Sequence, residues 1–438
     1  MTAVVLFSEF CLENALKLST LHFMDLQGLK KNIIPGMNLQ AFRNVMETEL
    51  NKIIGYWMEY GPDCKNGGFV GRVNGLNKQM YYANKGSVLN SRILWTFSVM
   101  YKRTGEDAYG TLAKRAFDFI DQYFLDKEYG GVFSEVTFDG KPVSAKKQIY
   151  CQAFAIYSLT EYYAATKDQR SLDLAGEIFQ LVEKQSLDDT NNGYIEAFSN
   201  RWEPLTDFRL SDKDENFPKT MNNHLHLLEA YTNLYQVSGL PDVKAGLLNL
   251  VNLFTEFFIR DNGHLELYFD REWNPLKKYV SYGHDIEAAW LLNDAVDCID
   301  TNTDLTAAKE KAGMLAAVFR KEGIDENGGV FNSLNLETQT LDHEKHHWPQ
   351  AEAMVGLFDA YERTGDENYL RDCFRVYQFI DQFIIDDQNG EWYLRVEKDG
   401  HAIMDDKIGY WKCPYHNARA CMELIKRIDR LPGNEISG

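Results

Sequence analysis

A short turn signal recurs six times along the chain, and its regular spacing constrains the fold more than any other feature of the sequence. Each copy contains an Asn-Gly or a Gly-Gly pair, which favours the positive-φ backbone of tight turns. Consecutive copies lie 61 to 70 residues apart. Such spacing predicts a repeat architecture in which every unit is one supersecondary element. The glycines that mark the six turns are Gly68, Gly131, Gly193, Gly263, Gly329 and Gly390.

A second signal predicts what each unit contains. Gly105, Gly239 and Gly365 follow helical stretches and are typical of helix C-caps. Each unit is expected to hold a helix, a glycine turn, a second helix and a small β-hairpin, so six units predict twelve helices. Twelve helices fit an open solenoid or a closed barrel. We favour an all-α (α/α)6 barrel with short β-hairpins at one mouth, because six units close a double ring. The inner helices are expected at residues 90–101, 150–163, 221–235, 284–297, 349–361 and 414–428.

The composition is that of an ordinary globular protein, and it excludes several classes of partner. The clean helical pattern begins at Met37, so we expect one barrel domain over residues 37–438. Residues 1–36 are expected to be an N-terminal extension that is disordered or not native to the protein. A net charge of −19 argues against a nucleic-acid partner. Seven scattered cysteines predict reduced thiols in a cytoplasmic protein, and no apolar run approaches the roughly 18 residues of a membrane span.

Polar and aromatic residues gather where the predicted inner helices begin. His284, Glu287 and Trp290 follow one another at i,i+3 spacing and share a helix face. A carboxylate beside His284 would raise the pKa of the imidazole, whereas burial would lower it. His416 falls in the first turn of the last helix, after Pro414. Each histidine could also be a helix-start residue satisfied by a neighbour.

Three more helices carry candidates of the same kind. Asn222 and His226 are i,i+4 on one face, with Glu229 three residues further; His224 points elsewhere, so at most one of the two histidines joins a site. Arg92 lies in an otherwise apolar stretch and is expected to reach into the cavity towards an anion. Trp348 and Glu352, again i,i+4, suit a pyranose ring by stacking and by accepting hydroxyl hydrogen bonds.

The segment from His343 to His347 matches the H-E-x-x-H pattern of zinc proteases, but we reject a metal site there. That chemistry needs both histidines on one turn of a helix. Pro349 disfavours a helical conformation of Trp348, so the helix is expected to begin after the motif. Glycine-rich nucleotide loops and a G-x-S-x-G elbow are absent from the sequence.

Several histidines, an arginine and tryptophans around a barrel axis suit sugar chemistry. A glycoside hydrolase needs a pair of carboxylates, and Asp285, Glu287 or Glu352 are the candidates. Proton transfer next to a carbonyl needs bases with pKa values near neutrality and a group that stabilises an oxyanion. The abundance of histidine favours proton transfer. A non-catalytic sugar-binding barrel is the third possibility.

From about Asn38 onwards, the chain resembles the N-acylglucosamine 2-epimerase superfamily, and most closely its cellobiose 2-epimerase branch. Tyr282 before Gly283, and Ala288 after Glu287, depart from the N-acylglucosamine relatives and favour the disaccharide branch. The resemblance rests on five motifs in order: Asn90-Ser91-Arg92, residues 221–230, residues 281–290, residues 348–352 and residues 411–417.

The resemblance implies reversible inversion at C2 of the reducing-end sugar of a β-1,4-linked disaccharide, through a cis-enediol(ate) and without a cofactor. It assigns His284 and His416 as general base and acid on opposite faces of C2, His226 to ring opening, and Arg92 to the C1 and C2 oxygens. It also implies a monomer. By the same resemblance and its neighbouring motifs, the substrate-binding residues are Asn222, Glu287, Trp290, Trp348, Glu352, Trp411, Tyr150 and Asp214.

Two alternatives remain within this fold. An aldose–ketose isomerase could use the same enediol, and a mannobiose 2-epimerase would differ only in its substrate. The choice among cellobiose, lactose and mannobiose depends on loops over the second sugar.

Overall fold

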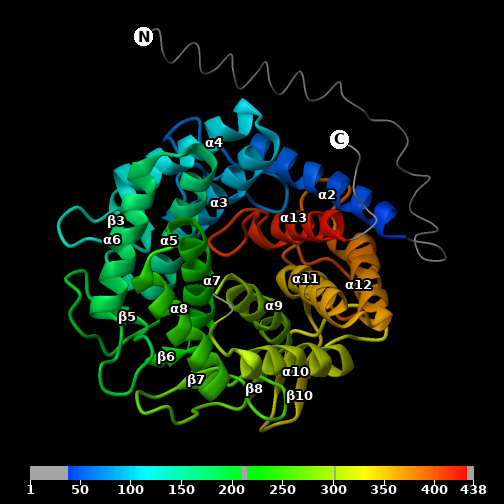
Figure 1. Ribbon diagram of the computed structural model, residues 1–438. Helices are drawn as coiled ribbons and strands as arrows, with labels where there is room; N and C mark the ends of the chain where they lie inside the picture. The colour runs from blue at the N-terminus through cyan, green and yellow to red at the C-terminus, as the bar shows by residue number, and fades with distance from the viewer. Residues whose placement is uncertain (1–37, 210–214, 300–301, 432–438) are drawn as a thin grey trace.

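Twelve α-helices form a closed double ring in the computed structural model, which describes residues 38–209, 215–299 and 302–431 (Figure 1). The predicted (α/α)6 barrel is therefore confirmed. The extension expected at residues 1–36 lies outside the described residues. The inner helices are α3 (Ser87–Thr104), α5 (Ile149–Thr166), α7 (Met221–Ser238), α9 (Tyr282–Cys298), α11 (His347–Thr364) and α13 (Tyr415–Arg430). The outer helices are α2 (Leu39–Tyr60), α4 (Asp107–Phe119), α6 (Gln169–Gln185), α8 (Pro241–Leu253), α10 (Thr306–Glu322) and α12 (Glu367–Phe379).

The two ends of the described chain close the ring. Each inner helix packs on the next, and α13 packs on both α11 and α3. The first outer helix, α2, covers the last inner helix, α13, which Figure 1 shows at the upper right. Arg43 of α2 holds Asp429 of α13 with an Nε–Oδ1 distance of 2.6 Å. The barrel is thus sealed by side-chain packing between segments nearly 400 residues apart in sequence.

Local signals in the sequence set the ends of the helices. Gly105, Gly239 and Gly365 cap α3, α7 and α11 with left-handed φ values of 71°, 63° and 69°, as predicted. The inner helices are buried on nearly every side, because neighbours in both rings cover them. Single π-helical turns, η1 (Ile120–Phe124), η2 (Phe254–Phe258) and η3 (Ile380–Ile384), end three of the outer helices. No helix in the described ranges is both long and apolar enough to span a membrane.

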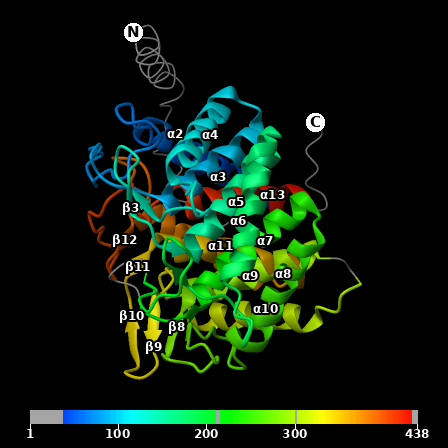
Figure 2. The same cartoon turned by 90° about the vertical axis from the view of Figure 1, so that its left-hand side faces the viewer.

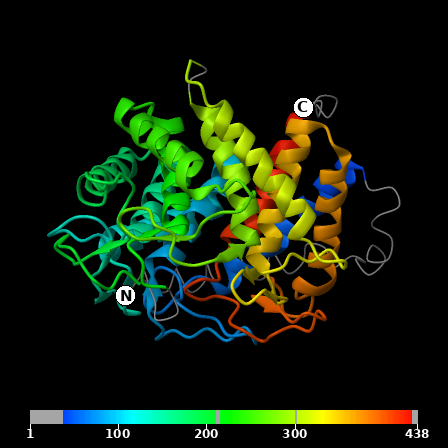
Figure 3. The same ribbon diagram turned by 90° about the horizontal axis from the view of Figure 1, so that it is seen from below.

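Short strands gather at the mouth where the inner helices begin (Figures 2 and 3). Each predicted turn is closed by one bridged residue pair, such as Pro62 with Phe69. The strands themselves pair neighbouring units: the strand before an inner helix pairs with the segment after the next turn. The antiparallel pairs are β1 (Lys85–Gly86) with β2 (Glu135–Val136), β4 (Lys147–Gln148) with β5 (Ala197–Phe198), β6 (Lys219–Thr220) with β7 (Tyr268–Phe269), β8 (Tyr279–Ser281) with β9 (Ser333–Asn335), and β11 (Lys345–His346) with β12 (Arg395–Val396).

The remaining pairings complete this ring of strands. Val73 bridges Ile408 and so links the first unit to the last. Two further strands, β3 (Pro142–Ser144) and β10 (Thr340–Asp342), extend the β1–β2 and β8–β9 pairs into three-stranded sheets.

Five of the six turns are fixed by a buried ion pair that sequence reasoning did not anticipate. A lysine, which in four of the five cases lies two residues before the inner helix, places its Nζ on the aspartate that begins the turn. This aspartate also accepts hydrogen bonds from turn backbone N–H groups. The lysine side chains are 0 or 1% exposed. The pairs and their N–O distances are Lys85–Asp63 (3.0 Å), Lys147–Asp126 (2.6 Å), Lys219–Asp188 (2.9 Å), Lys345–Asp325 (3.0 Å) and Lys407–Asp386 (2.9 Å).

Removing one member of such a pair should strongly destabilise the barrel. Lys85→Met leaves the buried carboxyl of Asp63 without its ion-pair partner, so we expect a loss of about 3–5 kcal/mol in the free energy of unfolding, measured by urea denaturation. Lys114→Met, which removes an exposed pair with Asp118, is the control and should cost less than about 1 kcal/mol. Equal losses in the two variants would contradict this account.

Candidate active site

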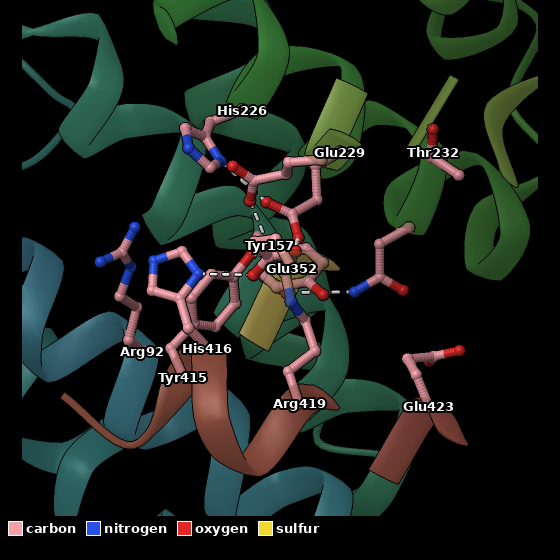
Figure 4. A network of polar contacts seen from close by, with 12 residues as sticks. Arg92, Tyr157, His226, Glu229, Thr232, Glu352, Tyr415, His416, Arg419 and Glu423 are labelled. Carbon is pink, nitrogen blue, oxygen red and sulfur yellow. Dashed lines mark hydrogen bonds and ion pairs between the residues drawn. The ribbon is translucent and has the colours of Figure 1, made fainter. Parts of the chain in front are cut away.

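Three histidines at the strand-lined mouth of the barrel each have one ring nitrogen fixed. Nδ1 of His226 lies 3.0 Å from Oε2 of Glu229, which confirms their predicted proximity on α7. Nδ1 of His416 on α13 lies 2.6 Å from Oε1 of Glu352 on α11 (Figure 4). Nδ1 of His284 lies 2.7 Å from the hydroxyl of Ser281. Within the described residues, Nε2 of each ring has no hydrogen-bond partner, so this nitrogen is the one available to a ligand.

The surroundings keep these histidines neutral. Burial and, to a smaller extent, the nearby His226 lower the pKa of His284 to about 3. Burial also lowers the pKa of His226, against the opposing effect of Glu229, and holds that of His416 well below its usual range. Of the two opposing effects that the sequence suggested for His284, burial therefore prevails. Glu287 does not bind His284 but Arg419. Each neutral imidazole presents an unshared lone pair at Nε2 that can accept a proton. The pKa of His284 lies well below the near-neutral value that the sequence led us to expect for a general base.

Arg92 brings an unneutralised positive charge to the same space. Arg92 is only 2% exposed. Nη2 donates to the hydroxyl of Tyr150 at 3.0 Å, and Nη1 lies 3.6 Å from Sγ of Cys413. The guanidinium is stacked over the rings of Phe154 and Tyr415. Among the described residues no carboxylate forms an ion pair with it, and its Nε has no partner. A cation in this condition is suited to stabilising a developing oxyanion.

Arg419, which the sequence analysis missed, has the opposite environment. It lies on α13, one turn after His416, and is 1% exposed. Its guanidinium pairs with Glu229 of α7, with Glu287 of α9 at 2.8 Å and with Glu352 of α11 at 2.7 Å. The reasoning that selected Arg92, an arginine on a largely buried helix, would also have selected it. Arg419 therefore joins four inner helices across the barrel axis.

The three carboxylates around Arg419 are electrostatically distinct. Burial and the proximity of Glu352 raise the pKa of Glu287 well above its usual range. The pKa of Glu352 is also raised by burial. The pKa of Glu229 falls to about 2, because Arg419 and His226 together outweigh burial. Glu229 and Glu352, which hold two of the histidines, thus depend on the same guanidinium.

Three tryptophans lie close to the histidines, to Tyr150 and to the carboxylates of the site. The ring of Trp348 lies 4.7 Å from that of His284 and 5.8 Å from that of His416. The ring of Trp411 is 5.9 Å from that of Tyr150, and its side chain is among the exposed large apolar residues. Both tryptophans can stack on sugar rings. Trp290 donates from Nε1 to Oε2 of Glu352 at 3.1 Å, so it supports the carboxylate that holds His416.

Of the remaining residues that the sequence suggested, Asn222 lies near the site, whereas His224 and Asp285 bind the backbone of turns. Asn222 lies one helical turn before His226, and its buried Oδ1 has no partner. His224 faces outwards, where its Nε2 accepts from the backbone N–H of Tyr194 at 2.9 Å. Asp285 likewise binds a turn, as described below, so it is not placed for glycoside hydrolysis. Asp214 lies outside the described residues.

The geometry also bears on metal binding at the H-E-x-x-H segment and at the buried cluster around His416. Helix α11 begins at His347, two residues earlier than expected, while His343 precedes β11, so the H-E-x-x-H segment does not lie on one helical turn. Glu287, Glu352 and His416 bring ligand atoms within 4.8 Å of one another. There, however, the guanidinium of Arg419 already supplies the positive charge.

Comparisons with known proteins show the family to which the chain belongs. The family model of N-acylglucosamine 2-epimerase matches residues 68–420. The chain is 42% identical over 389 residues to the cellobiose 2-epimerase of Bacteroides fragilis, covering 88% of this chain and 99% of the relative, and 36% identical over 407 residues to that of Dictyoglomus turgidum, covering 92% and 100%. The solved cellobiose 2-epimerase of Bacillus thermoamylovorans superposes with a TM-score of 0.85 at 36% identity, covering 89% of this chain and 100% of that one. The chain therefore belongs to the N-acylglucosamine 2-epimerase family.

Proposed function

We propose that this protein reversibly inverts C2 of the reducing-end residue of β-1,4-linked disaccharides, converting cellobiose to glucosyl-mannose and lactose to epilactose. The observation that carries the proposal is the pairing of neutral histidines on different inner helices with the unneutralised guanidinium of Arg92. The similarity to cellobiose 2-epimerases supports a disaccharide as substrate.

The chemistry follows from the acidity of the C2 proton. This proton is acidic only in the open-chain aldehyde, because the carbonyl can take up the negative charge. His226, held by Glu229, is placed to assist ring opening through its free Nε2. One of His284 and His416 then takes the C2 proton on its neutral Nε2, and the other, which enters this step as an imidazolium, gives a proton from Nε2 to the opposite face. Proton exchange with water afterwards restores the starting state of both rings. Arg92 stabilises the enediolate oxygens as charge develops on them.

The carboxylates around Arg419 argue against glycoside hydrolysis. A hydrolase needs two carboxyl groups directed at the glycosidic bond. Here Glu229, Glu287 and Glu352 all bind Arg419, and two of them also bind histidines. Their geometry suits the orientation of the imidazoles and leaves the proton transfer to the histidines.

Product analysis tests the proposal directly. Incubation of the purified protein with cellobiose should yield glucosyl-mannose with an intact glycosidic bond, detected by NMR of the anomeric protons. Parallel reactions with lactose and mannobiose would identify the preferred substrate. Ketose products would indicate an aldose–ketose isomerase, free monosaccharides would indicate a hydrolase, and an unchanged spectrum for all three sugars would contradict the proposal.

Loss of either proposed base should abolish epimerisation but not binding. We expect His284→Ala and His416→Ala to lower kcat by at least about 10²–10⁴-fold, because each removes a general acid–base group. Binding of cellobiose, measured by calorimetry, should persist. The control is His401→Ala, which alters an exposed histidine on the surface and should retain full activity. Near-normal turnover of either catalytic variant would remove the two-histidine assignment.

Arg92 should affect the rate far more than affinity. In Arg92→Met, the charge that faces the enediolate is lost, and kcat should fall about 10²–10³-fold. The KM should change much less, because the interaction strengthens only as the substrate acquires negative charge. A variant with a raised KM and an unchanged kcat would show that Arg92 only binds the ground state.

A further inference from the structure

The turn before the fourth inner helix departs from the lysine pattern of the other five. Val280 of β8, which pairs with Leu334, occupies the strand position that Lys345 holds where it pairs with Val396. The turn itself carries Arg260 in place of the aspartate: its backbone N–H donates to the carbonyl of His264. This turn therefore lacks the fixed charge pair that anchors the other turns.

His264 fills the place of that missing pair. Its side chain is 7% exposed. Nδ1 lies 2.7 Å from Oδ2 of Asp285 on α9, and Nε2 lies 3.3 Å from Oε2 of Glu322 on α10. The other carboxylate oxygen of Asp285 accepts from the backbone N–H of Leu265 at 2.9 Å. One imidazole thus ties the turn to an inner and an outer helix.

The residue that His264 holds is unusual for its position. At equivalent places on other inner helices, Gln152, His224 and Gln350 bind the backbone N–H of the preceding turn with neutral groups. Asp285 does so with a carboxylate that has no exposure to water. Burial raises the pKa of Asp285, whereas the hydrogen bond and charge of His264 oppose this rise, so an imidazolium at His264 favours the ionised carboxylate. Asp285 also follows His284 directly, so whatever fixes Asp285 fixes the helical turn that presents His284.

We propose that His264 is a positioning residue for His284: as an imidazolium between Asp285 and Glu322, it anchors the first turn of α9, and its deprotonation loosens this anchor. His264 takes no part in proton transfer to the sugar. The inference deepens the proposed function and rests on it, because its kinetic readout is epimerisation.

The charges around His264 favour its protonated form. Asp285 and Glu322 face it from the two helices, and from the turn Arg260 pairs with Glu266 at 3.3 Å. Lys321 lies beside Glu322 at 3.7 Å. Burial lowers the pKa of His264, but the two carboxylates outweigh burial, so the pKa lies above its ordinary value. Deprotonation leaves an Nε2 lone pair facing Glu322.

Because folding raises the pKa of His264, the stability that this residue contributes depends on pH. A histidine whose pKa is raised by folding stabilises the protein fully below the unfolded pKa of about 6.5, and this stabilisation is lost as pH rises through the folded pKa. The anchor of α9 is therefore complete in mildly acidic solution and weakens on the alkaline side. Epimerisation should lose rate in the same pH window.

Two variants and a matched control separate positioning from simple stability. His264→Gln should lower kcat about tenfold through misplacement of His284, with little change in KM, and should remove the alkaline loss of rate that wild type shows. Glu322→Gln, at a partly exposed site, should keep the acid-side kcat and move the alkaline limb to lower pH by about half a unit. Glu310→Gln removes the same charge from an exposed position on α10 and should behave as wild type.

NMR titration of the His264 ring gives a readout that does not depend on turnover. We expect a pKa above 6.5 in wild type and in Glu310→Gln, and a lower one in Glu322→Gln. If the wild type does not epimerise any disaccharide, the proposed function fails while this titration still tests the charge state of His264. A kcat and pH profile unchanged in His264→Gln, with only a lower melting temperature, would show a purely structural role and overturn the inference, as would an unraised pKa.

Discussion

The guanidinium of Arg419 is the interaction on which the site depends most. It is buried on the barrel axis and binds carboxylates from three other inner helices. One of these, Glu352, fixes His416, and another, Glu229, fixes His226. Without the arginine, three carboxylates would lie together in a medium of low dielectric constant, and removing one partner of such a network costs several kcal/mol. A single positive charge thus holds the inner ring together and orients two imidazoles.

Arg92 shows why the second arginine has a different role. Both guanidinium groups are buried and both are stacked on Tyr415, yet Arg419 is surrounded by carboxylates and Arg92 has aromatic rings, a hydroxyl and a thiol as neighbours. The charge of Arg419 is neutralised by carboxylates of the protein, whereas that of Arg92 remains available to an anion. Arg92 lies on α3 and Arg419 on α13, and these two helices become neighbours only because the ring closes between them. Ring closure therefore brings the two arginines to the same tyrosine.

The sequence predicted the repeat and the closed barrel, because these depend on local signals such as turn glycines and helix C-caps. The spacing along α7 also predicted that His226 lies beside Glu229, but it did not predict Ser281 as the partner of His284 or Glu352 as the partner of His416. The sequence did not predict the pairing of strands between units, since two-residue strands have no periodicity to detect. Nor did it reveal the partners of Arg419 or of the buried lysines, which lie on other helices or turns. Lysine is usually found at the protein surface, so Lys85 gave no sign of burial, and only the fold places Asp63 beside it. The direction of the pKa shift of His284 also required the burial that the folded chain imposes.

The central claim is that His284 and His416 act on opposite faces of C2, and hydrogen–deuterium exchange tests it most directly. Each alanine variant would be incubated in D2O with cellobiose and, separately, with glucosyl-mannose, and deuterium at C2 would be measured by NMR. The account predicts that each variant still exchanges the C2 proton of one epimer without inverting it, and that the two variants retain exchange in different epimers. Loss of exchange with both epimers in one variant, together with full exchange with both in the other, would show that a single base serves both faces and would contradict the account.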